Sequence, residues 1–337
     1  MKKARYYKPL QDSKALCELC PHLCKIAEGK TGICKVRKNE EGTLYSANYG
    51  RICSMHTDPI EKKPLYHFFP GRNILSAGSI GCNLRCRFCQ NWEISQSDVE
   101  DFSLTGIVSP GEIVSKAKSQ QDNIGIAYTY NEPTVWYEFM YDTAVQAHEE
   151  GLKNVMVTNG FITPEPLRDL IPFMDAFNVD LKGFSDSFYR SFTSSKLEPV
   201  LDSLKTIREE GRHLEVTHLL IPETNDDIAL FEKMIRWIVQ NLGRETVLHL
   251  SRYFPSYRMS TGPTPVATLR EFYESARQEL DYVYIGNVID SEGQNTECRK
   301  CGSAVIQRMR YMTKLTGLNE NGTCSHCGEQ IISENAI

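Results

Sequence analysis

The 337-residue sequence lacks long apolar runs, internal repeats and low-complexity tracts. No uninterrupted hydrophobic stretch is long enough to span a bilayer, and the basic segment from Met1 to Lys8 precedes no apolar run of the kind found in signal peptides. Basic residues are not in excess either, since the net charge is -5, which argues against nucleic acid as a main partner. These absences predict a cytoplasmic protein without a membrane partner.

Cysteine, by contrast, is abundant. The chain has the composition of an ordinary globular protein, with 41% hydrophobic and 24% charged residues, yet it contains twelve cysteines. In a reducing compartment, clustered cysteines indicate metal binding rather than disulfides. The cysteines form three groups, and Cys53 remains alone. We expect Cys53 to be a small buried hydrophobic residue.

The middle group, Cys82, Cys86 and Cys89, has the spacing C-x3-C-x2-C. A cluster that only carries electrons is normally held by four thiolates, so three ligands would leave one iron of a 4Fe-4S cluster open to a substrate. The competing interpretations are three buried structural cysteines or half of a zinc site. Zinc ribbons, however, pair their ligands in C-x2-C knuckles. The spacing therefore favours a reactive iron–sulfur cluster.

Two outer groups of four cysteines can each close a metal site. The C-terminal group has two C-x2-C pairs, each followed by glycine, which is a zinc-ribbon pattern with a role that can be purely structural. The N-terminal group is spaced C-x2-C-x3-C-x9-C and permits zinc or an auxiliary iron–sulfur cluster, because thiolates suit both. The ligands are Cys298, Cys301, Cys324 and Cys327 in the C-terminal group, and Cys17, Cys20, Cys24 and Cys34 in the N-terminal group.

Between these groups, β-rich runs alternate with helical ones. Ile228, Phe231, Ile235 and Ile238, for example, have the three-to-four spacing of a buried helix face. Helices between strands imply right-handed crossovers and a parallel sheet. We therefore predict an α/β fold with strands at 74–79, 124–129, 154–158, 176–180, 213–221 and 247–251, and an extra strand at 282–285.

The cysteine spacing, the preceding Gly81 and the aromatic Phe88 resemble the signature of radical S-adenosylmethionine (SAM) enzymes. The resemblance implies a partial (β/α)6 TIM-like barrel at 71–290, between an N-terminal Cys-rich metal-binding segment and lead-in at 1–70 and a C-terminal zinc-ribbon-like module at 291–337. It also implies that the open iron chelates SAM, and that an electron from the cluster cleaves the sulfonium to give a 5′-deoxyadenosyl radical. The expected activity is that of an oxidoreductase that abstracts hydrogen.

Motifs at the predicted strand ends resemble the pyruvate formate-lyase activating enzyme family over residues 74–255. Reactive groups of parallel barrels gather on the loops after the strands. Tyr130-Asn131-Glu132-Pro133 lies where family members often carry a Gly-Gly-Glu turn, and it keeps the glutamate but not the glycines. Two more strand-end motifs, Thr158-Asn159-Gly160 and Asp180-Leu181-Lys182-Gly183, match their counterparts. The resemblance implies SAM contacts as follows: Lys182 with the carboxylate, Glu132 with the amine, Asn159 and Asp180 with the ribose or methionine moiety, Gln90 and Asn91 near the adenosine, and Phe88 over the adenine.

A resemblance over nearly the whole chain, including segments between Asp58 and Gln96, is to the radical SAM member of the AmmeMemoRadiSam trio. The resemblances imply two kinds of substrate. The first is a glycyl-radical enzyme, and the second is either a small molecule or an AmmeMemoRadiSam partner protein. A third interpretation is an iron–sulfur electron carrier or interaction module. Reduced flavodoxin or ferredoxin is the implied electron donor. His67, His218 and His249 are candidate substrate-side groups, although structural histidines are commoner.

Overall fold

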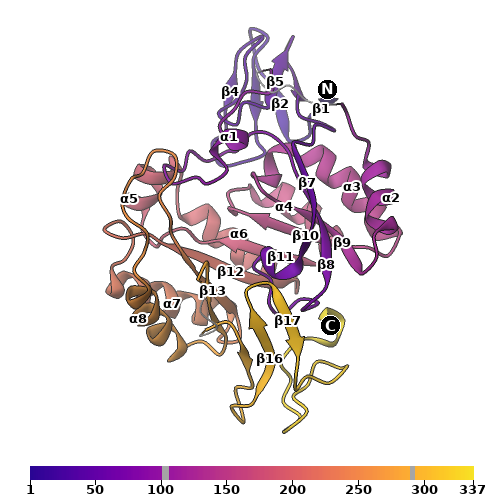
Figure 1. Cartoon of the computed structure of the whole chain (residues 1–337). Coiled ribbons are helices and arrows are strands. Elements are labelled where there is room, and N and C mark those ends of the chain that lie inside the picture. Colours follow the sequence, from indigo (N-terminus) through magenta and orange to yellow (C-terminus); the bar gives the residue numbers. More distant parts are fainter. Residues whose placement is uncertain (101–105, 289–292) are drawn as a thin grey trace.

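The computed structural model describes residues 1–100, 106–288 and 293–337. Within these residues, the largest sheet has eight strands in the order β14-β13-β12-β11-β10-β9-β8-β7 (Figure 1). Strands β8 to β14 are parallel, and β7 pairs antiparallel with β8 at one edge. The strands are β7 Ser54–Pro59, β8 Asn73–Gly78, β9 Asn123–Tyr128, β10 Lys153–Thr158, β11 Ala176–Asp180, β12 His213–Leu220, β13 Val247–Arg252 and β14 Val283–Gly286.

The predicted α/β fold with a parallel sheet is confirmed, and each predicted strand matches an observed one to within one residue at either end. Strand β7 was not predicted. It belongs to the stretch that we expected to lead into the barrel, and it extends the sheet beyond the parallel strands.

Helices connect the successive parallel strands, as the alternating pattern requires. Helix α7 buries Phe231, Ile235 and Ile238, three of the residues with helical spacing, and Asp227 caps its first turn by accepting a hydrogen bond from the Leu230 amide at 3.0 Å. The helices are α1 Trp92–Ser95, α2 Pro110–Ser119, α3 Tyr137–Glu149, α4 Pro164–Leu170, α5 Asp186–Phe188, α6 Glu198–Glu209, α7 Ile228–Leu242 and α8 Val266–Arg277, with 3-10 helices η1 Ile60–Lys62, η2 Pro133–Trp136, η3 Ile171–Phe173 and η5 Glu334–Ala336 and a π-helical turn η4 Tyr189–Thr193.

The N-terminal segment forms two small antiparallel sheets at one end of the barrel (Figure 1). It docks on α3 through Arg37, whose Nη1 lies 2.8 Å from Oε1 of Glu138 in a buried ion pair. Glu138 also accepts a hydrogen bond from the Arg5 amide at 2.7 Å. The strands are β1 Lys2–Lys3, β5 Arg37–Glu40 and β6 Thr43–Ser46 in one sheet, and β2 Tyr7–Pro9, β3 Ala15–Cys17 and β4 Lys25–Ile26 in the other.

The C-terminal segment forms a third antiparallel sheet at the opposite end of the molecule, from β15 Thr296–Glu297, β16 Ala304–Met309 and β17 Met312–Leu315 (Figure 1). Buried Arg308 ties this sheet to the barrel, because Nη2 donates to the Tyr66 carbonyl at 2.7 Å. Val305 and Ile306 belong to the same apolar cluster as Tyr66. The C-terminal module therefore shares its core with the barrel. In the part of the chain that the structure describes, no helix combines the length and apolar character needed to cross a membrane.

Candidate active site

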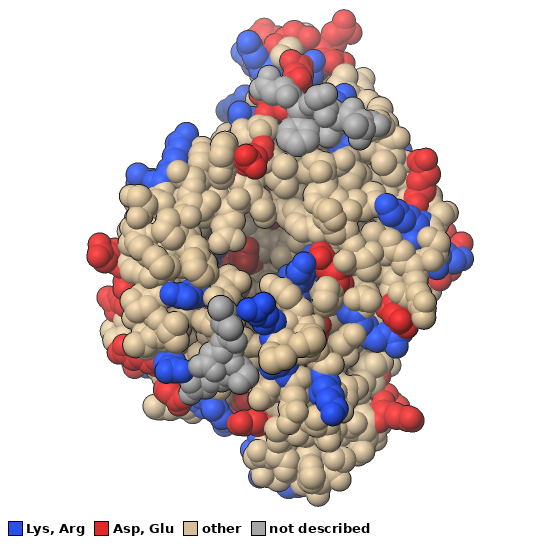
Figure 2. Space-filling model, viewed as in Figure 1, with Lys and Arg blue, Asp and Glu red and all other residues tan. Residues whose placement is uncertain are grey.

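A cavity of about 1080 Å³ opens where the carboxyl ends of the parallel strands meet. It is the hollow near the centre of the face in Figure 2. The three cysteines of the middle group line it, and so do all seven residues that the sequence suggested for SAM. These residues are Cys82, Cys86, Cys89, Phe88, Gln90, Asn91, Glu132, Asn159, Asp180 and Lys182.

The cysteine loop follows β8 and its sulfur atoms have polar neighbours. Cys82 Sγ accepts a hydrogen bond from the Leu84 amide at 3.3 Å, and Cys89 Sγ lies 3.2 Å from the Ser95 hydroxyl. Burial raises the pKa of the Cys86 thiol to about 12, although the charge of Lys182 acts in the opposite direction. Buried thiols of this kind become thiolates when a bound metal supplies the compensating charge. The donor set therefore fits an iron–sulfur cluster with three protein ligands.

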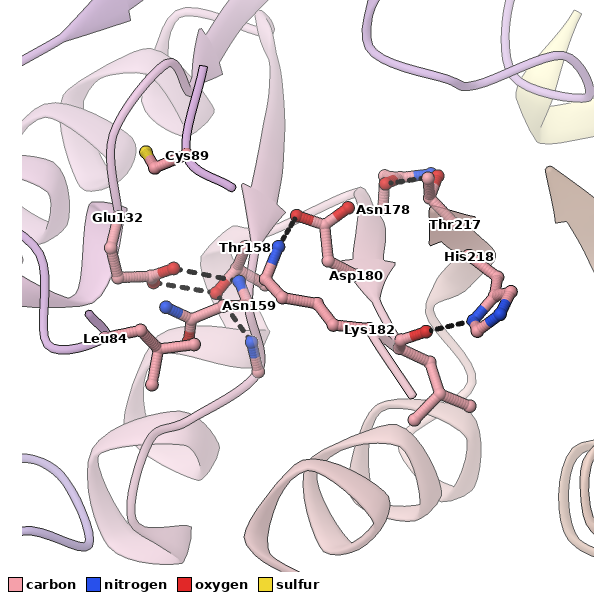
Figure 3. A network of polar contacts seen from close by, with 12 residues as sticks. Leu84, Cys89, Glu132, Thr158, Asn159, Asn178, Asp180, Lys182, Thr217 and His218 are labelled. Atoms are coloured by element: carbon pink, nitrogen blue, oxygen red, sulfur yellow. Dashed lines mark hydrogen bonds and ion pairs between the residues drawn. The ribbon is translucent and has the colours of Figure 1, made fainter. Parts of the chain in front are cut away.

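Glu132 is buried at the cavity wall and holds two loops together (Figure 3). Its Oε1 accepts hydrogen bonds from the Thr134 amide at 3.0 Å and from the Thr158 hydroxyl at 2.7 Å, and its Oε2 accepts one from the Asn159 amide at 2.8 Å. Burial raises the pKa of Glu132, although these hydrogen bonds lower it in part. The carboxylate thus fixes the turn after β9 to the end of β10.

Lys182 and Asp180 lie side by side at the end of β11 (Figure 3). Nζ of Lys182 is 2.8 Å from Oδ2 of Asp180. Burial is the largest single influence and would lower the pKa of Lys182, but the charges of Asp180 and Cys86 and the hydrogen bond to Asp180 together outweigh it, so the pKa is raised. The ammonium group therefore stays charged at the cavity wall, where it can bind an anion.

The structure explains how the chain replaces the two glycines of the turn after β9. Tyr130 has φ of 72°, a left-handed conformation that glycine adopts most easily. Asn131 accepts a hydrogen bond from the Ser79 amide at 3.0 Å and donates one to the Gly81 carbonyl at 2.8 Å, so its side chain braces the loop that enters the cysteine motif. Tyr130 donates to Asp58 at 2.9 Å.

Sequence reasoning missed part of the cavity lining. Asp58 comes from β7, Lys62 from η1, and Lys63 directly follows η1; Nζ of Lys63 is 2.8 Å from Oδ2 of Asp58. Tyr311, from the turn between β16 and β17, also reaches the cavity. The available signal in the sequence was the family resemblance of the segment that begins at Asp58, which contains all three charged residues.

The three candidate histidines do not line the cavity. Nε2 of His67 lies 2.6 Å from the Tyr284 hydroxyl, and Nε2 of His249 lies 2.6 Å from Oε2 of Glu215. Nδ1 of His218 lies 2.7 Å from the Leu181 carbonyl oxygen. Each histidine thus has a buried contact of the kind expected for a structural histidine.

The two outer cysteine groups each come together in space. The ligand sulfurs of Cys298, Cys301, Cys324 and Cys327 all lie within 4.8 Å of one another. The N-terminal Cys17, Cys20, Cys24 and Cys34 line one small cavity. Cys53 is half-buried, and its thiol donates to the Ser79 carbonyl at 2.9 Å.

Comparison with known proteins identifies the family. The family model of the Radical SAM superfamily matches residues 78–235. An uncharacterized protein from Methanocaldococcus jannaschii is 46% identical over 98% of this chain and 99% of its own length. The chain belongs to the radical SAM superfamily, whose members use SAM and a 4Fe-4S cluster.

More distant relatives have assigned activities. The pyruvate formate-lyase-activating enzyme of Listeria monocytogenes is 24% identical over 47% of this chain and 66% of its own length. Among solved structures, a radical SAM methyltransferase from Sphaerobacter thermophilus has a TM-score of 0.52 and 20% identity, over 65% of this chain and 67% of that one. The structural likeness supports the fold and leaves the substrate open.

Proposed function

We propose that this protein is a radical SAM oxidoreductase that cleaves SAM reductively and abstracts hydrogen from a substrate. The observation that supports the proposal most directly is the shared lining of one cavity by the three cysteines and the seven expected SAM contacts. In this proposal, Cys82, Cys86 and Cys89 hold the 4Fe-4S cluster. When bound, the cluster and SAM supply a 5′-deoxyadenosyl radical, while the protein positions the reactants.

Each wall of the cavity has a role in this proposal. Lys182 pairs with the SAM carboxylate, and Asn159 and Asp180 orient the ribose or methionine moiety. Glu132 acts on the SAM amine, and its hydrogen bonds also fix the turn that forms that part of the wall. The remaining contacts, at the adenosine, are Phe88, Gln90 and Asn91.

The first candidate substrate is a glycyl-radical enzyme, because several distant relatives are activating enzymes. The second is a small molecule or an AmmeMemoRadiSam partner protein. The polar wall of Asp58, Lys62 and Lys63 favours this second candidate, since it gives the cavity charged groups that SAM binding does not use. Reduced flavodoxin or ferredoxin is the proposed electron donor, and the cytoplasm the proposed location.

The C-terminal module is proposed to bind structural zinc. Zn–S bonds of about 2.3 Å place tetrahedral sulfurs about 3.8 Å apart. The sulfurs of Cys301 and Cys324 are 3.8 Å apart, and those of Cys298 and Cys327 are 3.5 Å apart. This spacing supports a closed zinc site. We assign the zinc-binding module to residues 291–337 and the barrel to residues 71–290.

The test is an anaerobic assay of the reconstituted protein with SAM and a strong one-electron reductant. We expect 5′-deoxyadenosine and methionine in equal amounts. Deuterated candidate substrates then distinguish the two substrate classes, because hydrogen abstraction transfers deuterium to 5′-deoxyadenosine. An electron carrier would yield neither product, and that result would refute the proposal.

A further inference from the structure

The N-terminal cysteines surround a cavity that the proposed reaction does not use. Besides the four sulfurs, Arg37 and Asn83 contribute to its lining. Cys17 is buried, and Cys20, Cys24 and Cys34 are half-buried. Thiols gathered in this way in a half-buried site indicate a metal centre.

Close spacing of the sulfur atoms sets the C-terminal group apart from the other two cysteine groups. The C-terminal four are compact enough to share one ion, with all ligand atoms within 4.8 Å of one another. Among the described residues, no other set of three or more metal-ligating side chains is gathered so closely. A four-iron cluster binds each thiolate to a different iron, so its ligands stand farther apart than those of a single ion. The N-terminal cysteines, like the catalytic ones, are not gathered so closely, as expected for the ligands of a cluster.

Buried Arg37 supplies a second observation. Its Nη1 pairs with Glu138 at 2.8 Å, but Nε and Nη2 have no hydrogen-bond partner among the residues that the structure describes. The side chain is only 1% exposed and lines the cysteine cavity. Buried donors are normally paired, so two donor nitrogens without partners beside four cysteines indicate an anionic occupant with several acceptors. An iron–sulfur cluster offers inorganic sulfides as well as thiolates.

The N-terminal cavity also lies directly beside the catalytic loop. Gly81 precedes the first catalytic cysteine and has φ of 90°, and a Cβ atom there would lie only 2.6 Å from the Cys34 carbonyl oxygen. Nε2 of His22 lies 2.7 Å from the Asn83 carbonyl oxygen. Asn83 lines the N-terminal cavity, while its neighbour Cys82 lines the large one. The two cysteine groups are thus separated by a single short stretch of chain.

We propose that Cys17, Cys20, Cys24 and Cys34 hold a second 4Fe-4S cluster, packed against the catalytic loop, and that Arg37 donates hydrogen bonds to it. A cationic donor stabilises the more negative, reduced state of such a cluster, so Arg37 raises its reduction potential. The proposal goes beyond the reaction proposed above and does not depend on it.

Metal analysis of the full chain, reconstituted anaerobically with iron and sulfide, is the primary test. In the variant Cys82→Ala/Cys86→Ala/Cys89→Ala, which lacks the catalytic ligands, we expect about four iron and four sulfide atoms per chain. Bound zinc in place of iron at the N-terminal site would overturn the proposal. If instead Cys82, Cys86 and Cys89 hold no cluster, wild-type protein will contain no more iron than this variant. The failure of the catalytic proposal can therefore be told apart from the failure of this one.

Two further variants locate the second cluster. In a Cys20→Ala/Cys24→Ala protein, iron should fall by about four atoms relative to wild type, whereas Cys53→Ala, outside all three groups, should lose none. If the double variant does not fold, the iron content of the variant without catalytic ligands still decides the question.

The role of Arg37 has its own readout. In the variant without catalytic ligands, Arg37→Lys removes N–H donors but keeps the charge. We expect a more negative reduction potential in a redox titration followed by electron paramagnetic resonance. An unchanged reduction potential would refute the proposed hydrogen bonds from Arg37 to the second cluster.

Discussion

The ammonium group of Lys182 lies 2.8 Å from the carboxylate of Asp180 on the wall of the large cavity. The pair keeps a positive charge where the SAM carboxylate is proposed to bind. Lys182→Ala should weaken SAM binding by about 1.5 to 3 kcal/mol, the scale of a charged hydrogen bond, and leave the cluster in place. Calorimetry under anaerobic conditions measures the change.

Lys205→Ala is the matched control for Lys182, because Lys205 is partly exposed and pairs with Asp202 on α6 at 2.8 Å, outside the cavity lining. The affinity of the Lys205→Ala variant for SAM should equal that of wild type. If Lys182→Ala also binds SAM as wild type does, the role proposed for Lys182 is wrong.

Replacement of Glu132 should affect stability as well as SAM binding. Glu132→Ala leaves the buried donors of Thr134, Thr158 and Asn159 without their acceptor. We expect the free energy of unfolding to fall by about 2 to 4 kcal/mol, and less in Glu132→Gln, which retains an amide oxygen. Denaturant titration of both variants measures the effect. Equal stability of Glu132→Ala and wild type would contradict the assigned hydrogen bonds.

The C-terminal site should hold zinc and stabilise the module. Cys301→Ala removes one of four clustered sulfurs, so we expect this variant to lose its zinc and melt at a lower temperature. Iron at the catalytic cysteines should be unchanged. Element analysis and a melting curve check the prediction, with Cys53→Ala as the control. Wild-type protein without zinc would refute the zinc assignment.

Buried His67 should make stability depend on pH. Burial lowers the pKa of His67 to about 3, with Glu215 acting in the opposite direction. The unfolded chain has an ordinary histidine pKa of about 6.5, so it binds a proton that the folded chain does not, and stability falls as pH drops from about 6.5 towards 3. At pH 5, His67 alone lowers the free energy of unfolding by about 2 kcal/mol.

His67→Gln removes this group, so unfolding measured between pH 7 and 5 should show a weaker pH dependence than wild type. His148→Gln, at an exposed position of α3, is the matched control and should follow wild type. A His67→Gln protein with the wild-type pH dependence would show that His67 does not titrate as described.

Much of the barrel could be predicted because its strands are apolar and its helices periodic. Strand β7 escaped prediction for a physical reason. His56 and Thr57 are exposed on this edge strand, so its sequence lacks the buried, apolar character that marked the central strands. Pairing with β8, which only the folded sheet provides, determines its conformation.

The candidate site likewise contains residues that the sequence could predict and others that it could not. Residues directly after strands, such as Asn159 and Lys182, could be assigned to one edge because parallel strands end together. The contact of Tyr130 with Asp58 joins residues 72 positions apart and depends on how β7 aligns with the sheet. The unpartnered donors of Arg37 likewise could not be predicted, because they depend on the burial of its side chain beside the N-terminal cysteines.

The most direct test of the central claim is reductive SAM cleavage by the Cys86→Ala variant, measured as 5′-deoxyadenosine formed under anaerobic conditions. Cys53→Ala is the control, since it removes a cysteine outside the three groups. Wild type and Cys53→Ala should produce 5′-deoxyadenosine, whereas Cys86→Ala should produce none, because no neighbouring thiolate replaces the lost ligand. Wild-type activity in Cys86→Ala would contradict the account.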